Sequence, residues 1–176
     1  MKKFSYVLSL ILLLTNIVLG DSVEIYTINP LDEYRGYCLD IKGYKSNAKI
    51  NQDLQTHTCY SYQGAIAVDQ GFDQFKVTNN EFFLPAFDVC MEAEFLSASS
   101  PLRLKKCNDS KLQQFKWDKQ GRIQTTSEST LCLTVAQGES HKGGGGSPVH
   151  RKRKLTLEPC SNMLNIYQIW GMRKSN

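Results

Sequence analysis

The stretch YCLDIKGYKSNAKINQDLQTHTC, residues 37–59, decides the fold of this chain. It opens on Cys38 and closes on Cys59 after the alternating run LQTHTC. The frame returns twice, from VCMEA to LRLKKC at 89–107 and from LCLTV to LTLEPC at 131–160. Each closing run alternates apolar with polar residues, which is the period of a half-buried strand. The sequence therefore predicts three related units.

An aromatic residue follows each closing cysteine: Phe75 in DQF, Phe115 in QQF and Trp170 in QIW. Turn signals separate strand-like segments, and we find no convincing helical period in the three units. Four short strands per unit give an all-β chain of about a dozen strands. One unit alone has too little apolar surface to be stable, so the three must share a core. The expected units cover residues 25–84, 85–126 and 127–173.

The N-terminus has the pattern of a secretory signal peptide, with Lys2 and Lys3 before an apolar run that ends near Gly20. That run of about 13 residues is short for a membrane-spanning helix, which needs about 20, although an uncleaved anchor is the alternative. We expect residues 1–20 to be removed and 21–176 to be a secreted, extracellular domain without a membrane span. Loss of the two lysines leaves 19 basic against 17 acidic residues. This near balance argues against a nucleic-acid or acidic-polymer partner.

Six cysteines lie beyond the expected signal peptide, and an even number in a secreted chain indicates disulfides. The repeat favours pairs within each unit over the other connectivities. A zinc site is the alternative, but the chain has no CxxC pair, so we expect no metal. The expected pairs are Cys38–Cys59, Cys90–Cys107 and Cys132–Cys160.

Three cysteine-paired units, each closed by a motif like Gln-x-Trp, resemble the ricin B-type lectins, whose fold is the β-trefoil. The resemblance covers about 25–172. Gln168-Ile169-Trp170 is intact, Gln113-Gln114-Phe115 replaces the Trp, and Asp73-Gln74-Phe75 has Asp at the Gln position. The resemblance implies that each aromatic fills the shared core and that each Gln ties backbone segments together.

The resemblance also implies a shallow sugar pocket in each unit, built from an Asp after the first cysteine, a Gln and an aromatic platform before the second. A sugar needs a flat surface under its apolar face and polar groups for its hydroxyls. The first unit carries Asp40, Gln55 and His57, with Asp73 and Gln74 near the closing motif. Because the corresponding positions of the other two units have lost this set, we expect one competent pocket. These diverged positions are Glu92, Arg103 and Lys105, then Thr134, Thr156 and Glu158.

Two features leave alternatives open. His57 is a small platform whose stacking should favour the neutral ring; alternatively it is a surface strand residue and Asp40 caps a turn. The segment HKGGGGSPVHRKRK, residues 141–154, predicts a mobile loop. Its basic run 151–154 is either solvated or a patch for heparin or anionic lipid. The sequence Asn108-Asp109-Ser110 is a glycosylation sequon.

The functional expectation is a lectin that binds glycans or glycoproteins, with a galactose-like preference implied by the resemblance. We expect no enzyme and no cofactor: paired cysteines are not nucleophiles, and neither GxSxG nor HExxH occurs. The alternative is a secreted trefoil that binds or inhibits a protein through its loops, such as 60–72 or 141–154.

Overall fold

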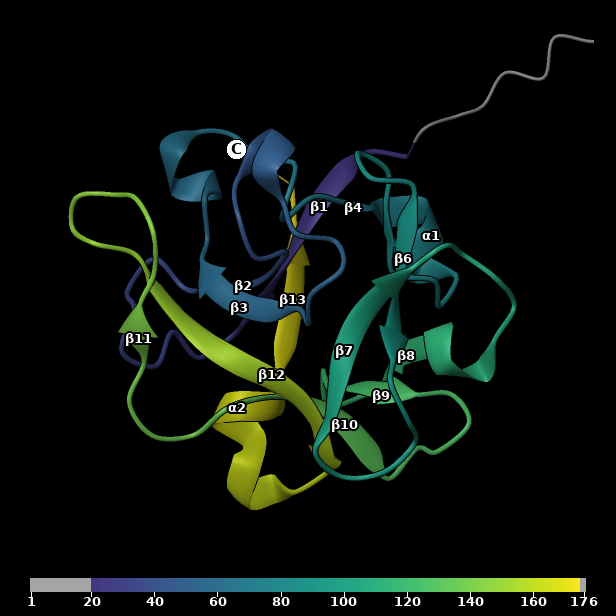
Figure 1. The fold of residues 1–176 in the computed structure, drawn as a ribbon. Helices are drawn as coiled ribbons and strands as arrows, with labels where there is room; N and C mark the ends of the chain where they lie inside the picture. The colour runs from purple at the N-terminus through teal and green to yellow at the C-terminus, as the bar shows by residue number, and fades with distance from the viewer. Residues whose placement is uncertain (1–19, 175–176) are drawn as a thin grey trace, which may run out of the picture.

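The computed structural model describes residues 20–174, so the expected signal peptide lies outside the described residues except for Gly20. Within that range, no helix is both long and apolar enough to cross a membrane. Thirteen strands join in one sheet system (Figure 1). The strands are β1 (Ser22–Thr27), β2 (Tyr37–Asp40), β3 (Gln55–Thr58), β4 (Phe72–Asp73), β5 (Phe83–Leu84), β6 (Val89–Ala93), β7 (Ser100–Lys105), β8 (Phe115–Trp117), β9 (Ile123–Thr125), β10 (Leu131–Val135), β11 (His141–Lys142), β12 (Arg151–Pro159) and β13 (Trp170–Arg173).

The three sequence repeats become three sets of strands. The opening and closing runs of each repeat pair antiparallel, as β2 with β3, β6 with β7 and β10 with β12. By this pairing the second repeat begins with β5 and the third with β9, a few residues before the expected boundaries at 85 and 127. The structure is therefore all-β with three related units, as the repeat indicated, and its fold is the β-trefoil that the family resemblance implied.

Contacts between repeats close the structure. The first strand, β1, pairs antiparallel with the last, β13, over four residue pairs. The long strand β12 pairs with β3 of the first repeat and with β7 of the second (Figure 1). The third repeat therefore supplies part of the surface around the first, which places residues near 152 beside residues near 57.

Each repeat contributes the aromatic of its closing motif to the shared core. Phe72, Phe115 and Trp170 start β4, β8 and β13 and are at most 2% exposed. The ring of Phe82 is edge-on to Phe72 and to Phe115, at centroid distances of 6.2 and 5.7 Å. Edge-to-face pairs at this spacing add to the free energy gained from burial alone.

The cysteines pair within each repeat, as expected. Bonds join Cys38 to Cys59, Cys90 to Cys107, and Cys132 to Cys160. Each bond connects the two paired strands of its repeat close to where they leave the sheet. Closing loops of this size stabilises a fold by about 3 kcal/mol per bond in the chain-entropy description.

Helical turns are short and lie in the connections. The α-helices are α1 (Gln74–Thr78) and α2 (Asn165–Gln168), and the 3₁₀ turns are η1 (Lys45–Asn47), η2 (Ser61–Gln63), η3 (Lys111–Gln113) and η4 (Asn162–Leu164). Asp73 starts α1, because its carboxylate accepts a hydrogen bond from the backbone N–H of Lys76 at 2.9 Å.

Candidate functional site

Strands β2, β3 and β12 place the candidate residues in two rows. Asp40 lies opposite Gln55, and Gln55 lies opposite Lys154. In the neighbouring row, His57 lies between Cys38 and Lys152. Directly opposed residues in antiparallel strands project to the same face of the sheet. Three of the five expected binding residues, Asp40, Gln55 and His57, are thus brought together.

Asp40 lies beneath this surface and is 2% exposed. Its carboxylate accepts hydrogen bonds from the side-chain amides of Gln55 at 2.7 Å and Gln70 at 3.1 Å. Burial raises the pKa of Asp40 well above its usual range, and the neighbouring Asp69 acts in the same direction. Each oxygen of the Asp40 carboxylate thus accepts from one amide, and Asp40 orients the side chains of Gln55 and Gln70.

The other two expected binding residues, Asp73 and Gln74, lie elsewhere. Asp73 caps α1 and also accepts a hydrogen bond from Gly20, while Gln74 is the first residue of α1. Phe75, expected in the core, is 67% exposed. The assignment of DQF as the closing motif was therefore wrong, and Gln70-Gly71-Phe72, three residues earlier, is the motif.

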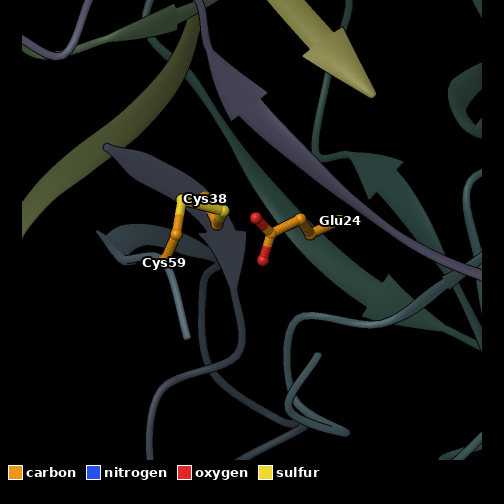
Figure 2. A group of neighbouring side chains, drawn as sticks. All are labelled: Glu24, Cys38 and Cys59. Atoms are coloured by element: carbon orange, nitrogen blue, oxygen red, sulfur yellow. A yellow bond between two sulfur atoms is a disulfide. The ribbon is translucent and has the colours of Figure 1, made fainter. Parts of the chain in front are cut away.

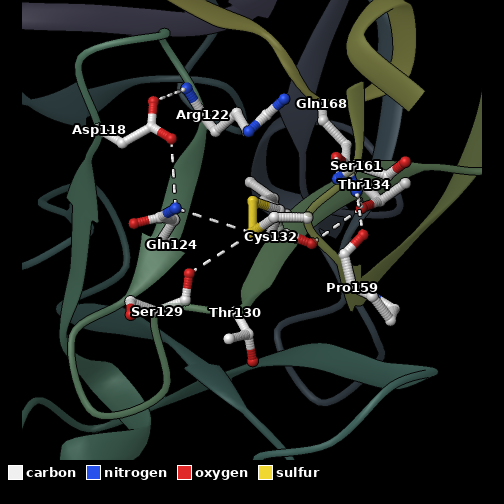
Figure 3. Close-up of a disulfide and its surroundings, with 12 residues drawn as sticks. Asp118, Arg122, Gln124, Ser129, Thr130, Cys132, Thr134, Pro159, Ser161 and Gln168 are labelled. Carbon is white, nitrogen blue, oxygen red and sulfur yellow. Dashed lines mark hydrogen bonds between the residues drawn. A yellow bond between two sulfur atoms is a disulfide. The ribbon is translucent and has the colours of Figure 1, made fainter. Parts of the chain in front are cut away.

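Gln70 makes the contacts that identify the motif. Its carbonyl oxygen accepts from the backbone N–H of Tyr60, and its amide donates to Asp40 and to the Thr58 carbonyl. Gln168 repeats the pattern with Ser161, Thr134 and Pro159 (Figure 3). Gln113 does so with Asn108, Glu92 and Lys106. In each repeat the Gln thus joins the residues flanking the second cysteine to the position two after the first.

A cavity of about 690 Å³ opens above the buried carboxylate. Gln55 and His57 line it from β3, and Tyr60 and Gln63 from the segment after Cys59. The third repeat completes the wall with Gly144–Gly146, His150 and Lys152. This volume lies within the usual range of small-molecule sites.

Four rings form an aromatic cluster at the cavity: His57, Tyr60 and His150, which line it, and Tyr62, which contacts His150. His57 and Tyr60 stack with an interplanar angle of 21° at 5.6 Å, and His150 meets both edge-on at 5.1 Å. The Tyr62 hydroxyl and His150 Nε2 form a hydrogen bond at 2.8 Å. His57 is consequently only 4% exposed, and Tyr60 has more surface facing the cavity.

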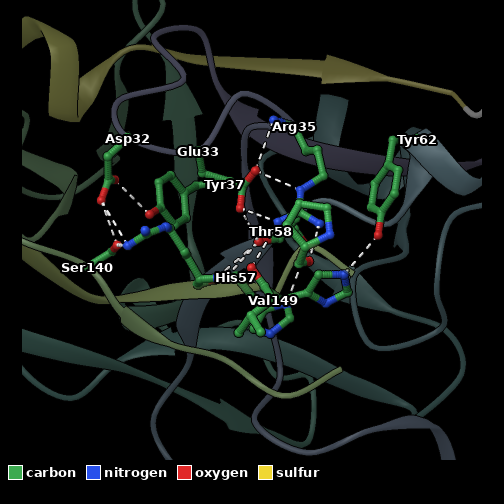
Figure 4. Close-up of polar contacts among 12 residues, drawn as sticks. Asp32, Glu33, Arg35, Tyr37, His57, Thr58, Tyr62, Ser140 and Val149 are labelled. Atoms are coloured by element: carbon green, nitrogen blue, oxygen red, sulfur yellow. Dashed lines mark hydrogen bonds and ion pairs between the residues drawn. The ribbon is translucent and has the colours of Figure 1, made fainter. Parts of the chain in front are cut away.

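The glycine-rich segment docks onto this cluster. A Cβ on Gly143 would lie 2.5 Å from His57 Nε2, and one on Gly146 would overlap the His150 ring. Arg35 donates to the carbonyls of Pro148 at 2.9 Å and Val149 at 3.1 Å (Figure 4). The glycines are therefore needed for close approach of the backbone to the two imidazoles.

The basic run that follows is partly internal, whereas the sequence left a solvated run and an anion-binding patch as the alternatives. Arg153 is 5% exposed, and its guanidinium donates to Asp32 at 2.7 Å and to the Ala136 carbonyl at 2.9 Å. Lys152 and Lys154 alternate with it and line cavities. Sequence reasoning missed Lys152 and His150 as site residues because a pairing between the first and third repeats positions them.

A buried carboxylate also lies beside the first disulfide. Glu24 and the sulfurs of Cys38 and Cys59 all lie within 4.8 Å of one another (Figure 2). The sulfurs are bonded to each other, so they are not the thiolates that bind zinc. Glu24 instead accepts a hydrogen bond from the Ser61 hydroxyl at 2.5 Å and pairs with Arg173.

The pKa of His57 tests whether the glycine-rich segment covers its ring. Burial lowers the pKa of His57 from 6.5 to about 4. The folded state disfavours the charged ring, so the free energy of unfolding falls when the ring must be protonated. The contribution of neutral His57 is fully present above pH 6.5 and is lost as the pH falls toward 4. At about 1.4 kcal/mol per pKa unit, the loss is about 3 kcal/mol.

We expect the ring resonances of His57 to titrate near pH 4 in an NMR experiment, with His57→Gln identifying the signals. Asp40 and Asp69 have raised pKa values and shift total stability in the opposite direction, so the ring itself must be observed. A midpoint near 6.5 would show that Tyr60 and Gly143 do not cover the imidazole.

Comparison with known protein families gives a match over most of the chain. The family model for the ricin-type beta-trefoil lectin domain matches residues 28–154. No curated protein sequence matches the chain at a significant level.

Solved structures with the same fold include several with bound sugars. The β-trefoil lectin of the Vibrio vulnificus hemolysin/cytolysin, with N-acetyl-D-lactosamine bound, is 15% identical, with TM-score 0.54 and coverage of 89% of this chain and 96% of that one. The C-half of the earthworm R-type lectin in complex with GalNAc is 14% identical, with TM-score 0.60 and coverage of 88% and 99%. A non-toxic homologue of type II RIPs from Momordica charantia, in complex with α-methyl-D-galactoside, is 15% identical, with TM-score 0.56 and coverage of 89% and 49%.

Proposed function

Because this chain belongs to the ricin-type β-trefoil lectin family, we propose that it binds carbohydrate through the cavity of its first repeat. The observation that carries the proposal is the cavity of about 690 Å³ that Gln55, His57 and Tyr60 line above the buried Asp40. The other two repeats have replaced this set with Glu92 and Lys105, or with Thr134 and Glu158.

Tyr60 is the stacking platform in this proposal, and His57 is its support. His57 stands at the position expected for the platform, but Tyr60 and the glycine-rich segment leave it 4% exposed. Tyr60 is partly exposed and lines the cavity. A phenol ring offers a flat apolar face to the CH side of a sugar ring, whereas a covered imidazole does not.

Gln55 is the residue that reads hydroxyl groups. Its amide nitrogen is held by Asp40 at 2.7 Å, which leaves its carbonyl oxygen without a hydrogen-bond partner among residues 20–174. A fixed acceptor at the cavity wall favours a ligand whose hydroxyls donate there. Gln52 and Gln63, also at the wall, supply further amides.

The sugar class in this proposal is galactose-like. Three structural neighbours carry N-acetyl-D-lactosamine, GalNAc and α-methyl-D-galactoside, and they share the fold with this chain at low identity. The three disulfides also support a secreted location, because such bonds persist in oxidising compartments.

The test is binding of galactosides to wild type, Tyr60→Ala and Gln55→Ala, measured by calorimetry. We expect wild type to bind a monosaccharide with a Kd on the order of millimolar, about −4 kcal/mol, and each variant to lose most of that binding. Tyr34→Ala is the matched control, because Tyr34 is 78% exposed and does not line the cavity. Equal binding by wild type and both cavity variants would reject the cavity as the site.

The protein-binding alternative points to the same surface. The loops named for it contribute Tyr60, Gln63, Gly144–Gly146 and His150 to the border of the cavity. If glycans do not bind and exchange of these loops abolishes capture of a protein partner, the alternative replaces the carbohydrate proposal.

A further inference from the structure

We infer that the ligand of this site is an acidic glycan, whose sulfate or carboxylate groups lie along a lysine-lined groove that extends from the cavity. The inference rests on the proposed carbohydrate-binding function and narrows its ligand class.

The groove consists of two adjoining cavities. The first, of about 690 Å³, shares Lys42, Gln55 and Lys152 with a second of about 400 Å³. The second runs along β12 past Lys154 to Thr156. The shared residues make the two cavities one continuous surface that is longer than a single sugar needs.

Four lysines line this groove without a carboxylate partner. Lys42, Lys49, Lys152 and Lys154 form no ion pair within 4.0 Å among residues 20–174. Of the described residues that line the two cavities, Asp53 is the one with a carboxylate near the surface, and it pairs with Arg103 at 3.2 Å. The positive charge is therefore available to a ligand.

The strand register explains why these lysines are free. Within the run Arg151–Lys154, Arg153 is neutralised by Asp32 at 2.7 Å, and Arg151 lies 3.7 Å from the same carboxylate. Lys152 and Lys154 lie opposite His57 and Gln55 instead. Two positions along a strand span about 7 Å, so consecutive acidic groups on one glycan chain would meet successive ammonium groups.

The shape of the site favours a sugar over other polyanions. The charge surrounds a concave cavity with an aromatic face and amides, which suits a hydroxylated ring. Over the whole chain beyond residue 20 the charge is nearly balanced, at 19 basic and 17 acidic residues. A binder of nucleic acid or anionic membrane would be expected to have a broad basic face instead.

The experiment compares a neutral galactoside with the same galactoside carrying one sulfate. We expect wild type to bind the sulfated sugar about tenfold more tightly at low ionic strength, with the advantage shrinking at high salt because exposed charges are screened. Lys152→Ala/Lys154→Ala should lose this advantage. Lys154→Ala alone, at a residue that lines only the second cavity, should lose part of it and still bind the neutral sugar. Lys106→Ala/Lys119→Ala removes the same charge from exposed positions outside the groove and should behave as wild type.

The other outcomes distinguish failure of the acidic-glycan inference from failure of the lectin proposal. Equal binding of the two sugars by wild type, or an unchanged preference in Lys152→Ala/Lys154→Ala, overturns the acidic-glycan inference and leaves the lectin proposal standing. Failure to bind either sugar rejects the lectin proposal itself. Tighter binding of a single-stranded oligonucleotide of equal charge overturns the inference in favour of an unspecific polyanion surface.

Discussion

Phe72→Ala is expected to lower the free energy of unfolding by about 3–5 kcal/mol, one of the two largest effects we expect from a single substitution. Phe72 is 0% exposed, and its ring packs edge-on against Phe82 at 6.2 Å. Truncation removes an aromatic from the point where the three repeats meet, and Phe115 and Trp170 belong to other strands and have little freedom to fill the space. Urea denaturation followed by fluorescence and circular dichroism measures the change.

Phe75→Ala is the matched control for this prediction, because it removes the same side chain three residues away. Phe75 is 67% exposed on α1, so we expect the free energy of unfolding to change by less than about 0.5 kcal/mol. If Phe75→Ala were the more destabilising change, Asp73-Gln74-Phe75 would be the core motif and the register described above would be wrong.

The sequence contained the signal that separates these two registers. The stretch DQGFDQF places two aromatics three residues apart, and only the earlier one follows a Gln at the motif's first position. A buried Gln satisfies backbone groups on both sides of a disulfide with its carbonyl and amide, whereas the Asp of DQF offers acceptors alone. Requiring a Gln two residues before the aromatic would have selected Gln70 and Phe72 as the closing motif.

Local repetition predicted the three all-β units and the disulfides, because each hairpin and its cysteine pair lie within about 30 residues of sequence. The family resemblance grouped Asp40, Gln55 and His57 in one pocket, and the pairing of β2 with β3 brings them together. Neither the repeat nor the resemblance could place the other side of the cavity. The pairing of Lys152 with His57 joins segments 95 residues apart, and no local pattern encodes that register.

The docked segment is the clearest case of such long-range structure. Four consecutive glycines indicate flexibility when they are considered alone. In the fold, Gly143 and Gly146 lie against His57 and His150, and Arg35 from the first repeat binds the carbonyls that follow. The glycines thus allow close packing instead. This packing depends on residues outside the segment, so the segment's own sequence does not predict it.

The ion pair that anchors this segment gives the second large prediction: Arg35→Ala should lower the free energy of unfolding by about 3–5 kcal/mol. The side chains of Arg35 and Glu33 are each 2% exposed, and Arg35 donates from Nε and Nη2 to the two carboxylate oxygens at 2.7 and 2.6 Å (Figure 4). Burial by itself raises the pKa of Glu33, but the hydrogen bonds from Arg35 and Thr58 reverse this and hold the pKa below its usual value. Without Arg35 a charged carboxylate stays buried with little compensation, which is the costly outcome.

Two further variants separate the loss of the charge pair from the loss of the docked segment. Glu33→Gln/Arg35→Met removes both charges, so we expect it to recover much of the stability lost in Arg35→Ala. Glu33→Gln/Arg35→Met cannot restore the hydrogen bonds from Arg35 to the carbonyls of Pro148 and Val149. Because the preceding residues Gly144–Gly146 form a wall of the cavity, galactoside binding should be weakened in Arg35→Ala and in Glu33→Gln/Arg35→Met alike. Arg151→Ala, at an arginine whose side chain is 48% exposed, should cost less than about 1 kcal/mol. Denaturation and calorimetry on the same samples give both quantities, and full binding by Glu33→Gln/Arg35→Met would show that Arg35 does not hold the cavity wall in place.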